Sequence, residues 1–459
     1  MRFRMTVGAL CALLITAVPA SAAPTPSLEE LWRVVQQQQS TIEQMSKKLD
    51  ATLAQLAQAE TKLAGAETKL ATTETKLAST ETKLADNEKK LEATADAVEA
   101  RAGVGEKSTS PSWADRTSLG GYGELHYNHL DNDGVAGGDQ NRTDFHRFVI
   151  YMSHEFNSWM RFGSELEVEH VVASSEDPGE VEVEQAWVEM DLNDKHRLRT
   201  GLDLLPIGII NTTHEPNTFY GVERNPIETE IIPSTWWEGG AAMSGEIRPG
   251  LNYDVVMHTG LIMPFSGDDA FRPREGRTEI AEADDHDVAF TGRLRYTGIA
   301  GLELAASGQY QADYTGTGDD AEAAAYLIET HLDYRHASGF GLRALYARWE
   351  LGSDRKHGLD PSSVGADHLS GWYVEPAYRF ALAGLVPVPG EVGLFSRYAR
   401  WDQADGLGGR FRNYERVSLG LNYWPVPQVV FKIDGQFEDA DGRVKREFDG
   451  FNLGFGYQF

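Results

Sequence analysis

The sequence has little cysteine, few basic residues and no long apolar run after its first segment, and each shortage excludes a class of protein. Cys11 is the only cysteine among 459 residues, so a mature chain that starts later can form no disulfide or thiolate metal site. Lysine and arginine number 42 against 70 acidic residues, and a net charge of −28 disfavours nucleic acid as a partner. Without an apolar run after Ala23 that could span a bilayer, a helical membrane bundle is excluded.

Residues 1–22 predict a cleaved secretory signal peptide. Arg2 and Arg4 precede an apolar stretch from Val7 to Val18, and residues 20–22 have the small Ala-Ser-Ala pattern that signal peptidase cuts. The alternative, an uncleaved membrane anchor, is disfavoured because so short an apolar segment cannot cross the hydrocarbon layer as a helix.

Residues 28–100 predict an α-helical coiled coil. An apolar residue recurs every seven positions from Leu28 to Val98, and four near-copies of one heptad fill Thr61 to Glu88. A strict period of seven keeps one stripe turned toward a partner helix. The second core position of each heptad is small or polar, so a single solvated helix stays open as the alternative. A linker with Gly, Ser and Pro is predicted over 101–117.

From residue 118 to residue 459 the period changes to two, which predicts a transmembrane β-barrel. Sixteen segments have about the 9 to 11 residues that a tilted strand needs to cross a bilayer. Every second connection is tight, as at Arg248 to Gly250, and the others are long and polar, an asymmetry typical of outer-membrane barrels. The expected fold is an all-β barrel of 16 antiparallel strands after an α-helical coiled coil. Alternatives of 14 or 18 strands stay open.

Charged residues at alternate strand positions predict a wall that faces water. Arg293 and Arg295 alternate with Leu294 and Tyr296, and an arginine facing lipid at mid-bilayer costs about 2 to 4 kcal/mol. These arginines are therefore expected in the lumen, although a charged face on a soluble sheet is the alternative. The residues predicted for the lumen wall are Arg147, Arg161, Glu165, Glu167, Glu182, Glu184, Arg293, Arg295, Arg343 and Arg397.

The third long connection, from Leu205 to Trp236, is predicted to fold inward and constrict the pore. It is the longest segment without strand character, and such loops are usually functional. The residues predicted at the constriction are Glu215, Phe219, Glu223, Arg224, Glu228 and Glu230. Their carboxylates are expected to face the wall arginines and create a transverse field, with mild cation preference from the excess of glutamate. An ordinary surface loop is the alternative.

Two parts of the sequence resemble known proteins. The apolar row Phe451, Leu453, Phe455, Tyr457 and Phe459 resembles the recognition strand that the outer-membrane barrel assembly machinery binds. Together with residues 122–148 and the Pro-Ile-Gly and Thr218 to Arg224 elements of the third loop, it is similar to the phosphate-selective porins O and P and their broader relatives. The resemblance implies a trimeric sixteen-stranded channel narrowed by its third loop. Those porins line their channel with lysines, which are few here, so phosphate selectivity is not implied.

No catalytic motif is present, and no enzyme, cofactor or metal site is expected. A Gly-x-Ser-x-Gly elbow and a His-Glu-x-x-His helix are both missing. His126 and His129 would point to opposite faces of a strand, as would His331 and His336, so neither pair can chelate a metal locally. An outer-membrane lipid hydrolase is a less favoured alternative.

The sequence therefore predicts a porin in the outer membrane of a Gram-negative bacterium, a passive channel for small hydrophilic solutes or ions. Its expected partners are membrane lipid, two further copies of the chain in a trimer, and peptidoglycan or a periplasmic protein bound by a periplasmic coiled coil. The alternative is a tether between the outer membrane and peptidoglycan, for which the barrel is only an anchor.

Overall fold

The computed structural model describes most of the chain after residue 111. The described residues are 112–134, 138–172, 179–278, 288–316, 323–354, 356, 358–383, 388–405 and 409–459, with Trp32, Gln36, Gln39 and Lys47 as exposed helical positions. The chain divides into two units, Met1–Ser108 and Thr109–Phe459. The signal peptide, most of the linker and all but these four positions of the coiled coil lie outside the described residues, so they stay predictions.

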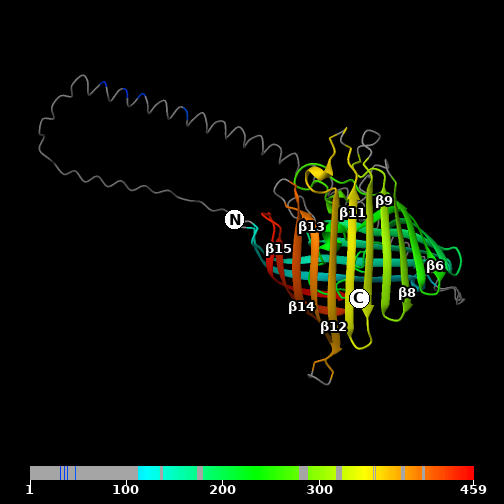
Figure 1. Cartoon of the computed structure of the whole chain (residues 1–459). Coiled ribbons are helices and arrows are strands. Elements are labelled where there is room, and N and C mark those ends of the chain that lie inside the picture. Colours follow the sequence, from blue (N-terminus) through cyan, green and yellow to red (C-terminus); the bar gives the residue numbers. More distant parts are fainter. Residues whose placement is uncertain are drawn as a thin grey trace, which may run out of the picture. The chain divides into compact units, whose positions relative to one another are not determined.

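Sixteen antiparallel strands form a closed barrel, as predicted (Figure 1). Each strand pairs with its neighbours along the chain, and β1 closes the barrel against β16. The strands are β1 (Thr117–Asn132), β2 (Gln140–Glu155), β3 (Met160–Glu169), β4 (Val181–Asp191), β5 (His196–Leu204), β6 (Trp237–Arg248), β7 (Leu251–His258), β8 (Ala289–Ile299), β9 (Leu302–Gln311), β10 (Ala325–Arg335), β11 (Phe340–Leu351), β12 (His368–Ala381), β13 (Glu391–Ala404), β14 (Phe411–Val426), β15 (Val429–Ala440) and β16 (Phe448–Gln458). Short helical turns lie at η1 (Ala114–Arg116), η2 (Ile227–Ile231), η3 (Arg274–Gly276) and η6 (Pro361–Ser363).

The two ends of the barrel differ in the length of their connections. Six of the seven connections that follow even-numbered strands have two to four residues, and both termini of the barrel lie at this short-turn end. The connections that follow odd-numbered strands form the long-loop end, where the third loop (residues 205–236) and the fourth loop (residues 259–288) are the longest. This alternation confirms the predicted asymmetry.

Several strands extend beyond the predicted segments. The sequence predicts a strand over 145–154, whereas β2 begins at Gln140 and pairs with β1 as far as Leu130. The added residues are polar, so a prediction based on the thickness of a bilayer stops too early. Backbone pairing continues because the antiparallel ladder needs no apolar environment.

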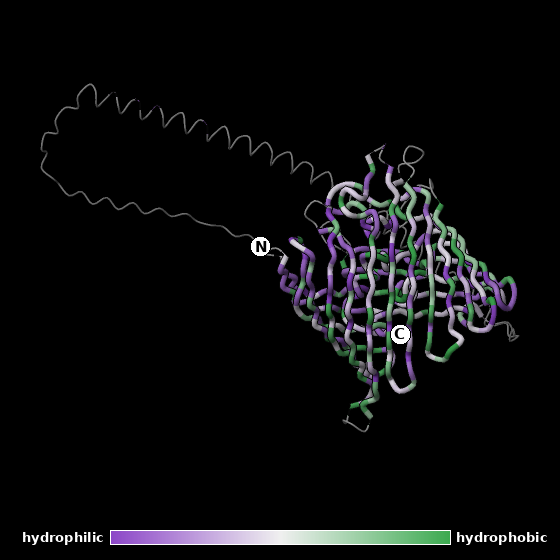
Figure 2. The backbone as a smooth tube through the Cα atoms, in the orientation of Figure 1, coloured by the Kyte–Doolittle hydropathy of each residue, from purple (hydrophilic) through white to green (hydrophobic). Residues whose placement is uncertain are grey.

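The outward face of the barrel is apolar. Polar and apolar residues alternate along the strands (Figure 2). Large side chains exposed on this face include Leu125, Ile150, Leu166, Val183, Met257, Phe290, Leu294, Ile328, Val374, Leu419, Phe437 and Leu453. Phe451 and Phe459 in the predicted recognition strand are exposed as well. None of the described helices is long and apolar enough to cross a membrane. The outward face of the strands fits a lipid environment.

The interior has an apolar side that the sequence analysis did not predict. Apolar side chains of β10 to β14 turn inward and pack on residues of the long loops, so one side of the lumen is a hydrophobic core. We call these luminal side chains the apolar wall: Ala325, Leu327, Leu345, Ala347, Trp349, Leu351, Leu369, Tyr373, Ala399, Trp401 and Tyr414. Charged side chains dominate the opposite side, on β1 to β4. The periodicity of a strand shows which residues point inward but not what they meet there.

Candidate functional site

The third long loop, residues 205–236 (L3), lies against the luminal face of the barrel. Its helical turn η2 contacts β11, β12 and β13. Glycines make room for this close approach: a Cβ atom at Gly371 would lie 2.9 Å from Ile231, and one at Gly456 would lie 2.5 Å from Pro216. Small residues at luminal positions of β12 and β16 therefore fit the loop to the wall.

One asparagine closes the neck of L3. The side-chain amide of Asn211 donates to the carbonyls of Leu205 (2.8 Å) and Trp236 (2.9 Å), and its oxygen accepts from the backbone N–H of Trp236 at 2.7 Å. Asn211 is fully buried. These bonds satisfy backbone groups where the loop leaves β5 and returns to β6, so they fix its direction of entry.

Glu228, which the sequence predicts at the constriction, is buried within the loop and stabilises L3 itself. The carboxylate accepts hydrogen bonds from the backbone N–H groups of Ile209 (2.6 Å) and Ile210 (2.5 Å), from Asn225 and from the hydroxyl of Tyr373. It is 0% exposed. A buried charge surrounded by four donors is well satisfied, and it joins both ends of the loop to β12.

Wall residues hold the tip of L3 by its backbone. Arg343 donates to the carbonyl of Thr218 at 3.0 Å, and Arg397 donates to the carbonyl of Tyr220 at 2.7 Å. Asn422 donates to the carbonyl of Phe219, and Asp434 accepts from the N–H of Val222. Successive backbone groups of the tip thus have partners on β11, β13, β14 and β15, which fixes the height of the tip within the barrel.

The expected field between loop carboxylates and wall arginines is not what the structure shows, because the wall arginines pair with carboxylates of the wall. Nε of Arg147 lies 2.6 Å from Glu124. Arg343 pairs with Asp333 at 3.2 Å and Arg397 pairs with Glu375. These paired side chains come from adjacent strands and lie next to each other on the luminal face. The wall therefore neutralises much of its own charge without L3.

Two cavities lie on either side of Phe219. One, at the short-turn end, has a volume of about 660 Å³ and is lined by the turn from His336 to Gly339. The other, at the long-loop end, has a volume of about 360 Å³ and is lined by Arg147, Glu223 and Arg224. Phe219 lines both, is 2% exposed and lies 3.6 Å below Nζ of Lys432. We call the two spaces the turn-end cavity and the loop-end cavity.

The predicted charges of L3 have different partners at the loop-end cavity. Glu223 lies 3.1 Å from His126 and accepts from Asn128 at 2.9 Å. Burial opposes the charge of Glu223, but His126 outweighs it and lowers the pKa of this carboxyl below its usual range. Burial and the nearby Arg147 lower the pKa of Arg224 to about 10.

His214 links L3 to the charged side of the barrel. Its Nε2 lies 3.6 Å from Glu165 and 3.5 Å from Glu184, and all three side chains are buried. Burial opposes the charged imidazole, but the two carboxylates outweigh this effect and raise the pKa of His214 to about 10. These three residues could hold a metal by their proximity. The protonated imidazole of His214 already supplies a positive charge that balances the carboxylates of Glu165 and Glu184.

The remaining predicted residues lie in several places. Arg161 pairs with Glu189 and Asp191 near the short-turn end, and Arg293 pairs with Asp254. Arg295 lies 3.7 Å from Glu303 and is 37% exposed. Glu167 is buried beside Arg147, Glu182 lines the loop-end cavity, and Glu230 lines it and pairs with Arg272. Glu215 is half-buried and, like Glu228, lines neither of these two cavities.

Sequence analysis missed the part that the fourth loop plays. Arg272 pairs with Glu230 at 2.9 Å, Arg274 donates to the carbonyl of Ser234, and Arg277 donates to the carbonyl of Thr235. Arg274 and Arg277 also line the loop-end cavity. Three arginines within six residues of an acidic sequence were the signal that could have identified this segment.

Comparison of the sequence with known proteins found a relative whose function is not described. No family model matches the chain. A protein of Aquifex aeolicus (strain VF5) described as uncharacterized is 29% identical over 363 residues, which cover 74% of this chain and 80% of the relative. The resemblance to the phosphate-selective porins stays a prediction.

Solved structures similar to the barrel cover 75% of this chain. They include an anion-selective porin from Comamonas acidovorans (TM-score 0.49, 11% identity, 99% of that chain) and the OmpF complex with daunomycin from Salmonella typhi (0.49, 13%, 97%). The outer membrane channel DcaP of Acinetobacter baumannii is also similar (0.47, 13%, 97%).

Proposed function

We propose that the protein is a porin of the Gram-negative outer membrane, which lets small hydrophilic solutes diffuse through a lumen narrowed by L3. The apolar outward face supports a position in a bilayer, and the closed sixteen-stranded barrel supports an aqueous interior. The short-turn end would face the periplasm and the long-loop end the exterior, as in other outer-membrane barrels.

The observation that supports the proposal most directly is that two cavities at opposite ends of the lumen share Phe219 in their linings. A solute that crosses the lumen would have to pass this side chain. Wall residues hold the backbone on both sides of Phe219, so the narrowest point would have a fixed size rather than a mobile gate. Charged linings on both sides would favour hydrated solutes.

Planar-bilayer recordings on the purified full chain test the proposal. Wild type should form open channels, and Phe219→Ala should raise the single-channel conductance roughly twofold or more, because the side chain at the narrowest point is removed. Phe290→Ala is the matched control, since this phenylalanine is exposed on the outward face. Absence of conductance from correctly folded wild type would refute the porin proposal. Equal conductance of Phe219→Ala and wild type would refute the proposed constriction.

The heptads of residues 28–100 favour a second role, as a tether from the barrel to peptidoglycan or a periplasmic protein. Deleting Leu28 to Val98 should then detach the envelope while conductance is retained. The trimer implied by the family resemblance is tested by the mass of the purified protein in detergent. A monomeric mass for wild type would contradict the trimer, and an intact envelope in the deletion strain would contradict the tether.

A further inference from the structure

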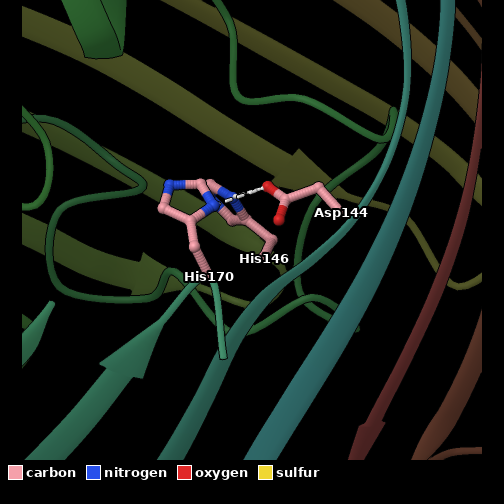
Figure 3. Close-up of side chains that lie close together, drawn as sticks. All are labelled: Asp144, His146 and His170. Carbon is pink, nitrogen blue, oxygen red and sulfur yellow. Dashed lines mark hydrogen bonds and ion pairs between the residues drawn. The ribbon is translucent and has the colours of Figure 1, made fainter. Parts of the chain in front are cut away.

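Three side chains that could bind a metal meet beside the loop-end cavity (Figure 3). Nδ1 of His170 lies 2.8 Å, and Nδ1 of His146 lies 3.4 Å, from the same carboxylate oxygen of Asp144. The ligand atoms all lie within 4.8 Å of one another. Tetrahedral zinc, with bonds of about 2.0 to 2.1 Å, places its ligands about 3.3 Å apart. One cation therefore fits among these atoms once the side chains adjust to this spacing.

A β-bulge turns His146 into the lumen. Glu124 pairs with Arg147, but His126 pairs with Asp144, so β2 has one more residue than β1 between these two pairs. Because of the extra residue, His146 and Arg147 both line the loop-end cavity although they are adjacent in sequence. Bulges often re-aim side chains beside functional sites.

A strained turn brings the third ligand to the first two. His170 follows β3 with φ of +50°, Val171 has φ of +63°, and the N–H of His170 donates to the carbonyl of His146 at 3.0 Å. Positive φ is unfavourable for a β-branched residue such as valine and costs on the order of 1 to 3 kcal/mol. Such strain persists where the surrounding structure holds the backbone in place. Here the strained turn holds the imidazole of His170 next to the carboxylate of Asp144.

The geometry points to a binding site for a divalent transition-metal cation of the Zn²⁺ class at Asp144, His146 and His170. Two imidazoles and one carboxylate suit Zn²⁺, whereas Mg²⁺ and Ca²⁺ prefer sites made only of oxygen. The two histidines line the cavity and about a quarter of each side chain is exposed, so an ion can reach them. Glu169 and Glu180 line the same cavity and favour the approach of a cation.

The metal site is independent of the proposed transport function. Metal binding can be measured on the protein in detergent, whether or not the protein conducts ions. Isothermal titration calorimetry of the full chain with ZnCl₂ should show one site per chain, and MgCl₂ should give no comparable heat. The double variant His146→Gln, His170→Asn should weaken Zn²⁺ binding at least about tenfold. Asn tolerates positive φ, so the turn at residue 170 is retained.

His336→Ala is the matched control, since His336 lies in the turn at the opposite end of the lumen. This variant should bind Zn²⁺ like wild type. Titration of wild type with Co²⁺ gives a second readout that needs no variant, since absorption bands of low-symmetry cobalt with nitrogen ligands are expected at one equivalent. Equal Zn²⁺ affinity in the double variant and wild type, or no Zn²⁺ binding and no cobalt bands in wild type, would overturn the site.

Discussion

The two sides of the lumen achieve the same end, a fixed L3, by opposite means. On the apolar wall, Trp349 and Tyr373 pack in a hydrophobic core with L3, and each also donates one hydrogen bond to the loop. On β1 to β4, which we call the charged wall, His126 and Glu184 hold L3 by ion pairs. Apolar contact is insensitive to salt and pH, whereas ion pairs respond to both. Both walls therefore anchor the loop, but only the ion pairs of the charged wall should weaken with salt or with a change of pH.

The apolar wall also explains how a barrel can be stable with a long loop in its interior. Trp349 is fully buried, and its indole N–H donates to the carbonyl of Ile231 in L3 at 2.8 Å. One side chain thus buries a large apolar ring and gives a backbone carbonyl of L3 its hydrogen bond. Burying such a side chain stabilises the structure by about 1.5 to 3 kcal/mol. A lumen with only charged side chains could not hold a loop of 32 residues in this way.

The largest expected effect comes from Glu228→Ala, which breaks the link between L3 and the apolar wall. Two backbone N–H groups and the hydroxyl of Tyr373 would lose their acceptor, at a cost of roughly 3 to 6 kcal/mol in unfolding free energy. Urea titrations in lipid vesicles measure this loss. Glu215→Ala is the control from the same loop and should change stability by less than about 0.5 kcal/mol. Similar losses in the two variants would contradict the role assigned to Glu228.

Trp349→Ala should be slightly less harmful, with a loss of about 3 to 5 kcal/mol, because it leaves a cavity in the apolar wall. The same urea titrations apply, and bilayer recordings should show a noisier open channel as L3 loosens. Trp372→Ala on the outward face is the matched control and should cost clearly less. If the exposed tryptophan proved the more important one, the apolar wall would not be the anchor.

A rise in pH should weaken the ion pairs between L3 and the charged wall. Because the folded pKa of His214 is raised to about 10, its contribution to stability is complete below the unfolded pKa of about 6.5. That contribution is lost progressively as the pH rises from about 6.5 to about 10, on the order of 2 to 4 kcal/mol. Melting temperatures at pH 6, 8 and 10 should therefore fall more steeply for wild type than for His214→Gln. Parallel curves would mean that His214 is not charged in the folded protein.

The smallest effect is expected for ion selectivity. Seven carboxylates and five arginines line the loop-end cavity, and this balance supports only a mild cation preference. Glu223→Gln beside Phe219 should reduce that preference, measured as a smaller reversal potential in a salt gradient. Glu180→Gln, at the long-loop end of the same cavity, is the control and should change it less. Anion selectivity in wild type would contradict the preference predicted from L3.

The sequence predicted some residues well because a strand has a period of two. Arg293 and Leu294 point to opposite faces as expected, with 9% and 53% exposure. The position of Glu228 could not be predicted by periodicity, because side chains in a loop do not alternate between two faces. The sequence therefore does not show whether a loop carboxylate faces the lumen or binds the backbone of its own loop. His146 was missed for a related reason, since a bulge breaks the alternation on which the prediction depended.

The sequence by itself determined the alternating faces of the strands and the asymmetry of the two ends, and it favoured sixteen strands over 14 or 18, because these features follow from local periodicity and turn length. Only the tertiary structure decided which charges pair, which side of the lumen is apolar, and that Asp144, His146 and His170 meet. These features depend on register, on a bulge and on the path of L3, all of which join residues far apart in the chain.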